Sequence, residues 1–442
     1  MKEVFIIGGG PGGIKLAQEL RVIGFNGKIH LLEDRFLGGE CTNVGCIPSK
    51  TIYNFSKMSY KFRKMFKKSL SFDIEIIVST LRKTVGTIRK GIEYNLKKAE
   101  VDVVNSKGIL YKDKLSIDGK LHGFDAVVVA TGSIPVRLGY NHERILTNRE
   151  LWGDMFDTFV NDLKKGIKVL IVGAGYIGLE TVSIFSNLFD NSHFVIIEKE
   201  RSIIPTADDD IISEVHKSLL KNNSNVNILT NSVINKIEPL ADNLVVEYVS
   251  NGNTIKDEFS FVVFSLGRKP NIPMDGVDKI EVDEFLRIKG LNNVWAIGDV
   301  IGGKLLAHKA EYQAKIVANN LVDTLQGGIS KHRYTKTNEI QIPSIMFSIP
   351  EVGWYGFTER ELKDIGLDYT SKKVNMASNA RAIVDNSREG FIKVLYNNRG
   401  EILGVHVIAE NVSELINIPM VYNSETIVYP HPTTAEIFNE LL

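Results

Sequence analysis

Two glycine-rich segments with one shared spacing constrain the fold of this 442-residue chain more than any other feature. Each follows a short aliphatic run and opens a helical pattern, as in strand–turn–helix units that bind a dinucleotide pyrophosphate on backbone N–H groups. A carboxylate ends the next apolar run, 25 positions after the first glycine in both units. The residues concerned are Gly8, Gly10, Gly13 and Glu33, and Gly173, Gly175, Gly178 and Glu198. The repeat predicts an α/β fold with two dinucleotide-binding domains of like topology.

The carboxylate of each unit indicates which nucleotide would bind there. In either unit it can accept hydrogen bonds from the hydroxyls of an adenosine ribose. Glu198 would repel a 2′-phosphate, so the second unit favours NAD over NADP. Lys199 and Arg201 follow closely and leave NADP as the less favoured alternative.

The segment 38–50 holds both cysteines of the chain, Cys41 and Cys46. A disulfide across so short a loop would stabilise the fold by only roughly 2 kcal/mol, which argues against a purely structural bridge. Pro48 fits the first turn of a helix, and a thiolate facing a helix N-terminus has a lowered pKa. A zinc site is disfavoured because no second Cys or Cys/His pair accompanies these two residues. A redox-active disulfide is favoured over two inert thiols.

Composition excludes several classes of partner. The 53 basic and 53 acidic residues balance, so no overall field would attract nucleic acid or an anionic membrane. The N-terminus has no secretion signal, and the apolar runs are too short to span a bilayer, so we expect a soluble cytoplasmic protein. The basic segment 56–69 could in principle lie on a membrane, but a packed helix with a solvated basic face is favoured.

Two further segments carry candidate functional residues. Asp299 ends the strand pattern 294–300 and can hydrogen-bond a polyol, and the helix pattern that follows can direct its N-terminus at a group that gains negative charge on reduction. His431 and Glu436 lie five positions apart at the start of a short helix. From this segment alone, an ordinary surface histidine is the favoured interpretation over an acid–base residue.

Together these segments resemble the class I flavin disulfide reductases, or pyridine nucleotide-disulfide oxidoreductases, over essentially the whole chain. The motifs that carry the resemblance are GGGPGG, GGECTNVGCIPSK, ATGS, GAGYIGLE, LGRKPN, AIGD, LAHKAE and HPTTAE. Within the family, the cysteine segment, LAHKAE and SELI look most like dihydrolipoamide dehydrogenases.

The resemblance implies two cofactors and the residues that bind them. FAD is expected on the first unit and NAD on the second. For FAD the implied residues are Gly8, Gly10, Gly13, Glu33, Thr131, Gly132, Asp299 and His308. For NAD they are Gly173, Gly175, Tyr176, Gly178 and Glu198. Tyr176 resembles the aromatic gate of the family, with plain packing between helix and sheet as the alternative.

The resemblance also implies catalytic roles and a homodimer whose partner completes each site. Cys46 is expected nearer the flavin, and Cys41, expected to be the more accessible sulfur, exchanges with the substrate. His431 from the other subunit would take the proton of the substrate thiol, with Glu436 fixing its tautomer. An ion pair between Lys50 and Glu180 is expected beside the flavin.

The expected architecture is two Rossmann-like dinucleotide-binding domains, for FAD and NAD, and a C-terminal α+β interface domain. The predicted boundaries are 1–147 for the first part of the FAD domain, 148–267 for the NAD(P) domain, 268–335 for a segment that returns to the FAD domain, and 336–442 for the dimerisation domain.

The leading functional prediction is a dihydrolipoamide dehydrogenase that acts on a lipoyl-bearing protein or another small disulfide substrate. One alternative is an NAD(P)H-dependent reductase of another disulfide, a quinone or a metal ion. The other is a non-catalytic flavin-binding redox sensor or scaffold. The segment between Ile416 and His431 is shorter than in dihydrolipoamide dehydrogenases, and Pro419 interrupts the helix expected there. This departure leaves the substrate open.

Overall fold

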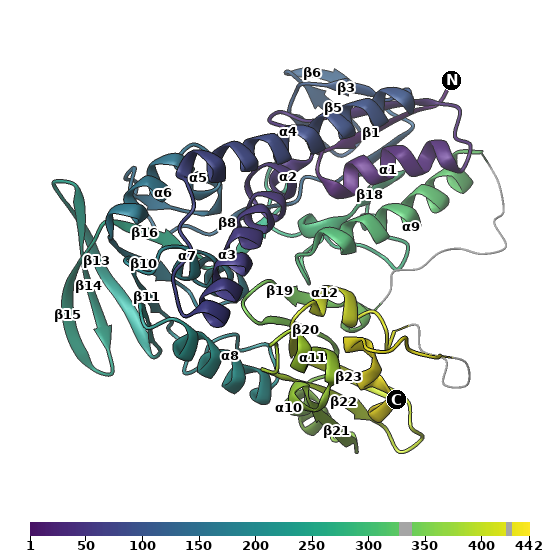
Figure 1. The fold of residues 1–442 in the computed structure, drawn as a ribbon. Coiled ribbons are helices and arrows are strands. Elements are labelled where there is room, and N and C mark those ends of the chain that lie inside the picture. Colours follow the sequence, from purple (N-terminus) through teal and green to yellow (C-terminus); the bar gives the residue numbers. More distant parts are fainter. Residues whose placement is uncertain (327–337, 421–426) are drawn as a thin grey trace.

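A computed structural model describes residues 1–326, 338–420 and 427–442 of the chain. The first sheet has the strand order β18-β7-β1-β2-β3, and all of its neighbouring strands are parallel. Helices α1 (Pro11–Val22) and α9 (Ala307–Gln326) lie side by side against it (Figure 1). The strands are β1 (Glu3–Ile7), β2 (Lys28–Leu32), β3 (Asp102–Val104), β7 (Ala126–Val129) and β18 (Val294–Ala296). Because β18 pairs with β7, the chain returns to the first sheet after it has built the second.

The second sheet repeats this design with the order β12-β11-β10-β16-β9, again in parallel pairs. Its strands are β9 (Ile145–Leu146), β10 (Lys168–Val172), β11 (His193–Ile197), β12 (Val226–Leu229) and β16 (Phe261–Phe264). Helices α5 (Asn148–Leu151), α6 (Phe156–Lys165), α7 (Tyr176–Leu188) and α8 (Asp209–Asn222) accompany it. The strand–turn–helix–strand unit predicted twice from sequence is therefore present twice. The residue numbers of the domain boundaries stay predictions.

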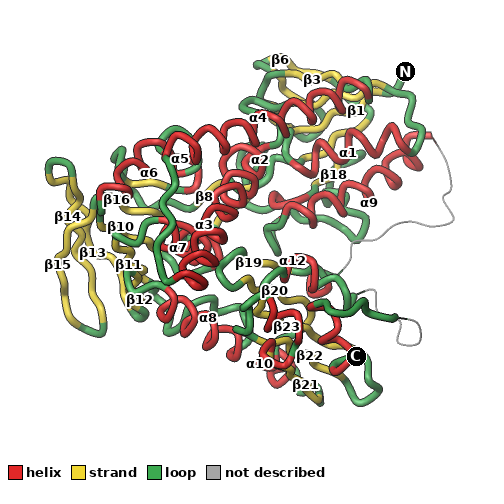
Figure 2. Tube along the Cα trace, viewed as in Figure 1, coloured by secondary structure: helices red, strands yellow, loops and turns green. Residues whose placement is uncertain are grey.

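Smaller antiparallel sheets decorate both units. In the second unit, three antiparallel strands form two successive hairpins that project from the body of the molecule (Figure 2). Its strands are β13 (Ser232–Leu240), β14 (Asn243–Ser250) and β15 (Asn253–Phe259). The first unit carries β4 (Gly108–Leu110), β5 (Leu115–Ile117) and β6 (Lys120–His122). Two short strands, β8 (Ser133–Pro135) and β17 (Arg268–Pro270), pair where the chain passes between the two units.

The C-terminal part is an antiparallel five-stranded sheet in the order β19-β20-β23-β22-β21, as the α+β prediction requires. Its strands are β19 (Ser344–Met346), β20 (Glu351–Gly356), β21 (Thr370–Asn375), β22 (Phe391–Tyr396) and β23 (Ile402–Ala409). Short helices cover it: α10 (Glu359–Asp364), α11 (Ala380–Val384), α12 (Val412–Leu415) and the 3-10 helix η4 (Thr434–Glu440). Part of the shortened segment before His431, residues 421–426, lies outside the described residues.

The helical region after the cysteines consists of α3 (Cys46–Phe66) and α4 (Ile74–Lys98), preceded by α2 (Gly39–Val44). Two local features separate α3 from α4. Lys67 ends α3 in the left-handed conformation, with φ 56°, and the Asp73 side chain caps α4 by accepting a hydrogen bond from the Glu75 N–H.

The basic face of α3 is exposed only in part, whereas the sequence predicted a solvated face. Its lysines form ion pairs with glutamates of the C-terminal sheet domain: Lys57 with Glu351 at 3.4 Å, Lys61 with Glu410 at 2.8 Å and Lys64 with Glu389 at 2.6 Å. Their spacing of four and three residues places all three lysines on one face of the helix. These three lysines, which we call the lysine stripe, hold α3 against the C-terminal sheet domain. In the described parts of the chain, no helix combines the length and apolar character that crossing a bilayer requires.

Candidate functional site

The two cysteines lie on either side of a tight junction between α2 and α3. Gly38 precedes α2 with φ 94°, and a Cβ there would lie 2.4 Å from the Thr42 side chain, so the turn requires glycine. The Asn43 amide donates to two upstream carbonyls at 3.0 and 2.8 Å, which closes this turn. Cys46 is the first residue of α3, as the position of Pro48 predicted.

The surroundings of the two cysteines give their thiols different pKa values. Cys41 and Cys46 share a hydrogen bond, which lowers the pKa of Cys46 to about 7 and raises the pKa of Cys41. The nearby charge of Lys50 also lowers the pKa of Cys46. Cys46 is therefore the sulfur of the pair that ionises first, close to neutral pH. In the described ranges, no three His, Cys, Asp or Glu side chains gather in a way that could hold a metal ion.

The two sulfurs stand in different surroundings. In the chain alone Cys46 is exposed and Cys41 is half-buried, and their order of accessibility with FAD bound stays a prediction. Cys46 stands at the open end of α3, whereas Cys41 lies within α2, one residue after a side chain that is held in a polar network. The assignment of the flavin side to Cys46 stays a prediction.

An ion pair connects the cysteine helix to the second nucleotide unit. Lys50 Nζ lies 2.8 Å from Glu180 Oε2, and it lies 4.6 Å from the centre of the Phe347 ring. The other oxygen of Glu180 accepts the backbone N–H of Phe347 at 2.8 Å. Glu180 belongs to α7, the helix of the second glycine fingerprint, and is buried. The structure thus brings Lys50 and Glu180 together as predicted, and it adds Phe347, which no sequence pattern indicated.

The glycines of the first unit leave room for a phosphate. A Cβ at Gly13 would lie 2.0 Å from the carbonyl of Gly8, so the helix can approach the strand only with glycine there. At Gly10, immediately before α1, a Cβ would meet no atom of the described residues within 4 Å. That space faces the helix N-terminus, where a pyrophosphate is stabilised. Glu33 accepts the N–H of Gly9 at 2.8 Å, and burial raises its pKa.

The second unit has the same arrangement. A Cβ at Gly178 would lie 2.1 Å from the Gly173 carbonyl, whereas at Gly175 it would meet no described atom within 4 Å. Glu198 accepts the N–H of Ala174 at 2.7 Å, the counterpart of the contact made by Glu33. The open spaces beside Gly10 and Gly175, which we call the Gly10 and Gly175 cradles, therefore each fit a dinucleotide.

Tyr176 is the first residue of α7 and is partly exposed. Its pKa is raised, first by desolvation and then by the nearby charges of Asp299 and Glu180, so its phenol stays neutral at physiological pH. Its role as a gate stays a prediction.

The remaining residues predicted to bind FAD lie on segments that meet at the edge of the first sheet. The Thr131 hydroxyl donates to the carbonyl of Asn271 at 2.6 Å, and Gly132 has φ 68°. Asp299 accepts the Ser133 hydroxyl at 2.6 Å. His308 Nε2 lies 2.8 Å from the Pro343 carbonyl, a contact that joins the start of α9 to the C-terminal domain.

His431 and Glu436 lie in contact, and their acid–base role stays a prediction. Nδ1 of His431 lies 2.8 Å from Oε1 of Glu436, so Nε2 is the ring nitrogen that this contact does not occupy. The other oxygen of Glu436 accepts the N–H of Thr433 at 2.7 Å, and these two contacts hold the pKa of Glu436 below its usual value. The C-terminal end of the chain lies away from α2 (Figure 1).

Two spaces that fit a dinucleotide, together with a cysteine pair in which Cys46 has a lowered pKa at a helix N-terminus, define a class of protein. This class is the nucleotide-dependent dithiol–disulfide oxidoreductases. Residues 2–314 match the family model of the pyridine nucleotide-disulphide oxidoreductases, and residues 342–442 match the dimerisation domain of that family. The chain belongs to this family of flavin disulfide oxidoreductases, whose cofactors are FAD and NAD(H).

Curated relatives are similar over almost their whole length. The mitochondrial dihydrolipoyl dehydrogenase of Pisum sativum is 31% identical, with 99% of this chain and 90% of the relative covered. A dihydrolipoyl dehydrogenase of Buchnera aphidicola subsp. Acyrthosiphon pisum is also 31% identical, with 98% and 94% covered. The leghemoglobin reductase of Vigna unguiculata is 31% identical, with 99% and 86% covered.

Solved structures share the fold. LpdA from Mycobacterium tuberculosis superposes with a TM-score of 0.85 at 21% identity, covering 100% of this chain and 98% of that one. The HOCl-induced flavoprotein disulfide reductase RclA from Escherichia coli gives a TM-score of 0.82 at 22% identity, covering 100% and 99%.

Proposed function

We propose that this chain is a dihydrolipoamide dehydrogenase that oxidises the dithiol of a lipoyl-bearing protein with NAD, as a homodimer. The observation that carries the proposal is the acidic Cys46 beside Cys41, joined through the Lys50–Glu180 ion pair to the second nucleotide unit. The names of the relatives that are 31% identical support the substrate.

The acidities of the cysteines support distinct roles. A substrate thiolate attacks Sγ of Cys41 in the oxidised pair, a new S–S bond forms, and the Cys41–Cys46 bond breaks. A thiolate of lower pKa leaves faster, so Cys46 is the better leaving group. The second substrate thiol then loses its proton and attacks the substrate sulfur of the mixed disulfide. Lipoamide leaves, the substrate has lost two electrons, and the cysteine pair has gained them.

The chain's own residues prepare the cysteines and the cofactor sites for this exchange. His431, held by Glu436 so that Nε2 is free, takes the proton of the substrate thiol. Glu180 Oε2 holds Nζ of Lys50 at 2.8 Å, and the charge of Lys50 favours the thiolate of Cys46. The Gly10 and Gly175 cradles would hold the pyrophosphates of FAD and NAD. The chemistry that bound FAD supplies is transfer of the electron pair between the cysteines and NAD(H).

The short segment before His431 keeps a second candidate function open. α12 spans only Val412–Leu415, and Pro419 follows it soon after. A segment of different shape beside the histidine would favour another disulfide, a quinone or a metal ion as the electron acceptor. A non-catalytic sensor is disfavoured because the cysteines, the ion pair and the His431–Glu436 pair are all in place.

A steady-state comparison of substrates tests the proposal. Purified, FAD-loaded protein is assayed with NAD and dihydrolipoamide, and with NADH and glutathione disulfide, a benzoquinone or Cu(II). We expect kcat/KM for dihydrolipoamide to exceed that for each other substrate by at least about tenfold. A higher value for one of the others would assign the reductase function instead.

Glu198 leads to a prediction on cofactor preference. We expect kcat/KM with NADH to exceed that with NADPH by at least about tenfold, because a carboxylate repels a 2′-phosphate. The measurement is NADH or NADPH oxidation with a quinone acceptor. Glu198→Gln should lower the ratio of kcat/KM with NADH to kcat/KM with NADPH. Glu238→Gln, on the projecting hairpin, should leave this ratio unchanged. A native preference for NADPH would contradict the role of Glu198.

The pKa of Cys46 leads to a prediction on pH dependence. In reduced protein, we expect iodoacetamide to alkylate Cys46 with a rate that rises through about pH 7, because the thiolate forms above that pKa. Lys50→Met should move the midpoint to higher pH, since it removes the cation that favours the thiolate. Lys98→Met, an exposed lysine at the end of α4, is the matched control. An unchanged midpoint in Lys50→Met would contradict the assigned cause.

A further inference from the structure

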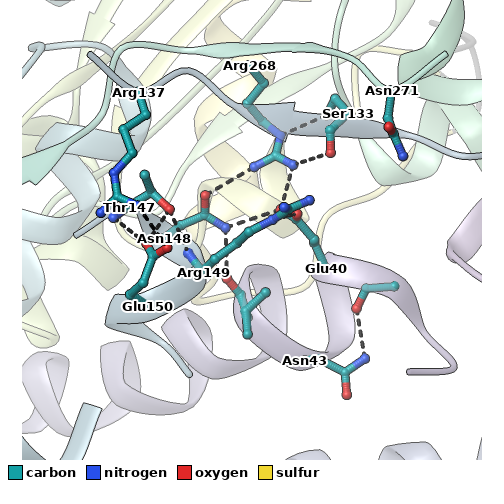
Figure 3. A network of polar contacts seen from close by, with 12 residues as sticks. Glu40, Asn43, Ser133, Arg137, Thr147, Asn148, Arg149, Glu150, Arg268 and Asn271 are labelled. Atoms are coloured by element: carbon teal, nitrogen blue, oxygen red, sulfur yellow. Dashed lines mark hydrogen bonds and ion pairs between the residues drawn. The ribbon is translucent and has the colours of Figure 1, made fainter. Parts of the chain in front are cut away.

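Glu40, the residue immediately before Cys41, lies at the centre of a polar network (Figure 3). One carboxylate oxygen of Glu40 accepts a hydrogen bond from Nε of Arg149. The other accepts from Nη2 of Arg268 at 2.5 Å and from the Asn148 amide at 3.3 Å. The side chains of Glu40 and Arg268 are only 19% and 13% exposed, so these charges are partly shielded from water.

The partners of Glu40 belong to the junction between the two nucleotide units. Asn148 and Arg149 form the start of α5, and Arg268 opens β17, the strand that pairs with β8 at the crossing. The Asn148 amide also donates to the carbonyl of Val44 at 3.0 Å. The junction therefore holds α2 both at its second residue and at its last.

The network continues toward the predicted flavin site. Nε of Arg268 donates to the Ser133 hydroxyl and Nη2 to the Ser133 carbonyl, both at 2.8 Å. The Ser133 hydroxyl donates in turn to Asp299 at 2.6 Å. A continuous chain of hydrogen bonds thus connects the residue before the substrate-side cysteine with the carboxylate expected to bind FAD.

We propose that Glu40 is a positioning residue for dithiol–disulfide exchange, which sets the place of the Cys41 sulfur by locking α2 to the domain junction. A helix of six residues does not hold its shape alone, so outside contacts determine where its cysteine lies. Bonds from arginine to a carboxylate are strong and directional enough for this task. The inference depends on the exchange chemistry of the family and is independent of which disulfide is the substrate.

The test compares Glu40→Ala and Glu40→Gln with Asp157→Asn, which removes the exposed Arg82–Asp157 ion pair between α4 and α6. Each FAD-loaded variant is assayed for NADH–benzoquinone turnover, which needs no cysteine, and for reduction of the Cys41–Cys46 disulfide by dithiothreitol. Alkylation of each reduced cysteine is followed by mass spectrometry. Dithiothreitol replaces lipoamide, so the result does not depend on the proposed substrate.

We expect Glu40→Ala to slow disulfide reduction by roughly 10- to 100-fold, since a misplacement of about 1 Å can cost that much. Quinone turnover should match the control, the half-buried Cys41 should be alkylated faster, and Glu40→Gln, which keeps an acceptor oxygen, should recover part of the rate. Unchanged exchange in Glu40→Ala overturns the proposal, and so does an equal loss of both activities together with FAD. If Glu40→Ala does not fold, Glu40→Gln decides: exchange at the control rate overturns the proposal.

Discussion

Replacing Cys41 with serine should abolish oxidation of dihydrolipoamide while FAD stays bound and NADH still reduces a quinone. The serine hydroxyl cannot form the mixed disulfide, so no exchange pathway remains. Loss of a catalytic nucleophile typically costs several orders of magnitude, and we expect at least on the order of 10³-fold in kcat. The measurement pairs lipoamide turnover with quinone turnover in one preparation, with the FAD content read from its visible absorbance.

Cys46→Ser is the matched variant for this experiment. It should also abolish lipoamide turnover, but it leaves Cys41 as a lone thiol without the partner that raises its pKa. Alkylation of Cys41 in Cys46→Ser should therefore occur at lower pH than in reduced wild-type protein. Normal lipoamide turnover in Cys41→Ser would refute the assigned nucleophile.

His431→Ala should slow dithiol–disulfide exchange by roughly 10²–10⁴-fold, the usual contribution of a placed base. Reduction of the flavin by NADH should remain at the wild-type rate, because this step involves no substrate thiol. Stopped-flow measurements separate the two half-reactions. Glu436→Gln should give a smaller loss, since it keeps a contact to Nδ1 but removes the charge that stabilises the protonated ring. An equal loss in both half-reactions would count against His431 as the base.

Hybrid dimers test whether His431 acts across the subunit interface. Cys41→Ser and His431→Ala chains with different affinity tags are co-expressed, and the mixed dimer is isolated. If each site combines cysteines of one chain with the histidine of the other, the hybrid contains one intact site and recovers about half of the wild-type activity. If both groups act within one chain, the hybrid is inactive.

Much of the site could be predicted because its parts are local in sequence. The turns at Gly8 and Gly173 belong to strand–turn–helix units. The glycines that such a turn requires lie within about ten residues of one another, so the sequence alone reveals them. Cys41, Cys46 and the helix start at Cys46 lie within one short segment. The Lys50–Glu180 pair spans 130 positions and could be predicted only through the resemblance of two separate motifs to a known family.

The parts that could not be predicted depend on packing between domains. Glu40 and Arg268 are 228 positions apart, and nothing in the pattern around either residue identifies the other. Arg268 belongs to the motif LGRKPN, which contributed to the family resemblance. That motif did not indicate that Arg268 contacts Glu40. The lysines of α3 were visible as a basic face, but periodicity does not reveal what covers a face. The end of α3 at Lys67 carries no proline or glycine that would mark it in the sequence.

One consequence of the ion pairs along α3 concerns the spacing of the two half-sites in the dimer. The helix begins with Cys46 and, further along, presents Lys57, Lys61 and Lys64 to the domain that carries the dimer contacts. α3 therefore sets the distance between the cysteines of a subunit and the domain that carries its dimer contacts. Inserting a single residue before Lys57 would turn the stripe by about 100° and advance it by about 1.5 Å. Such an insertion would carry the three lysines away from their glutamate partners, so the ion pairs constrain the length of this helix.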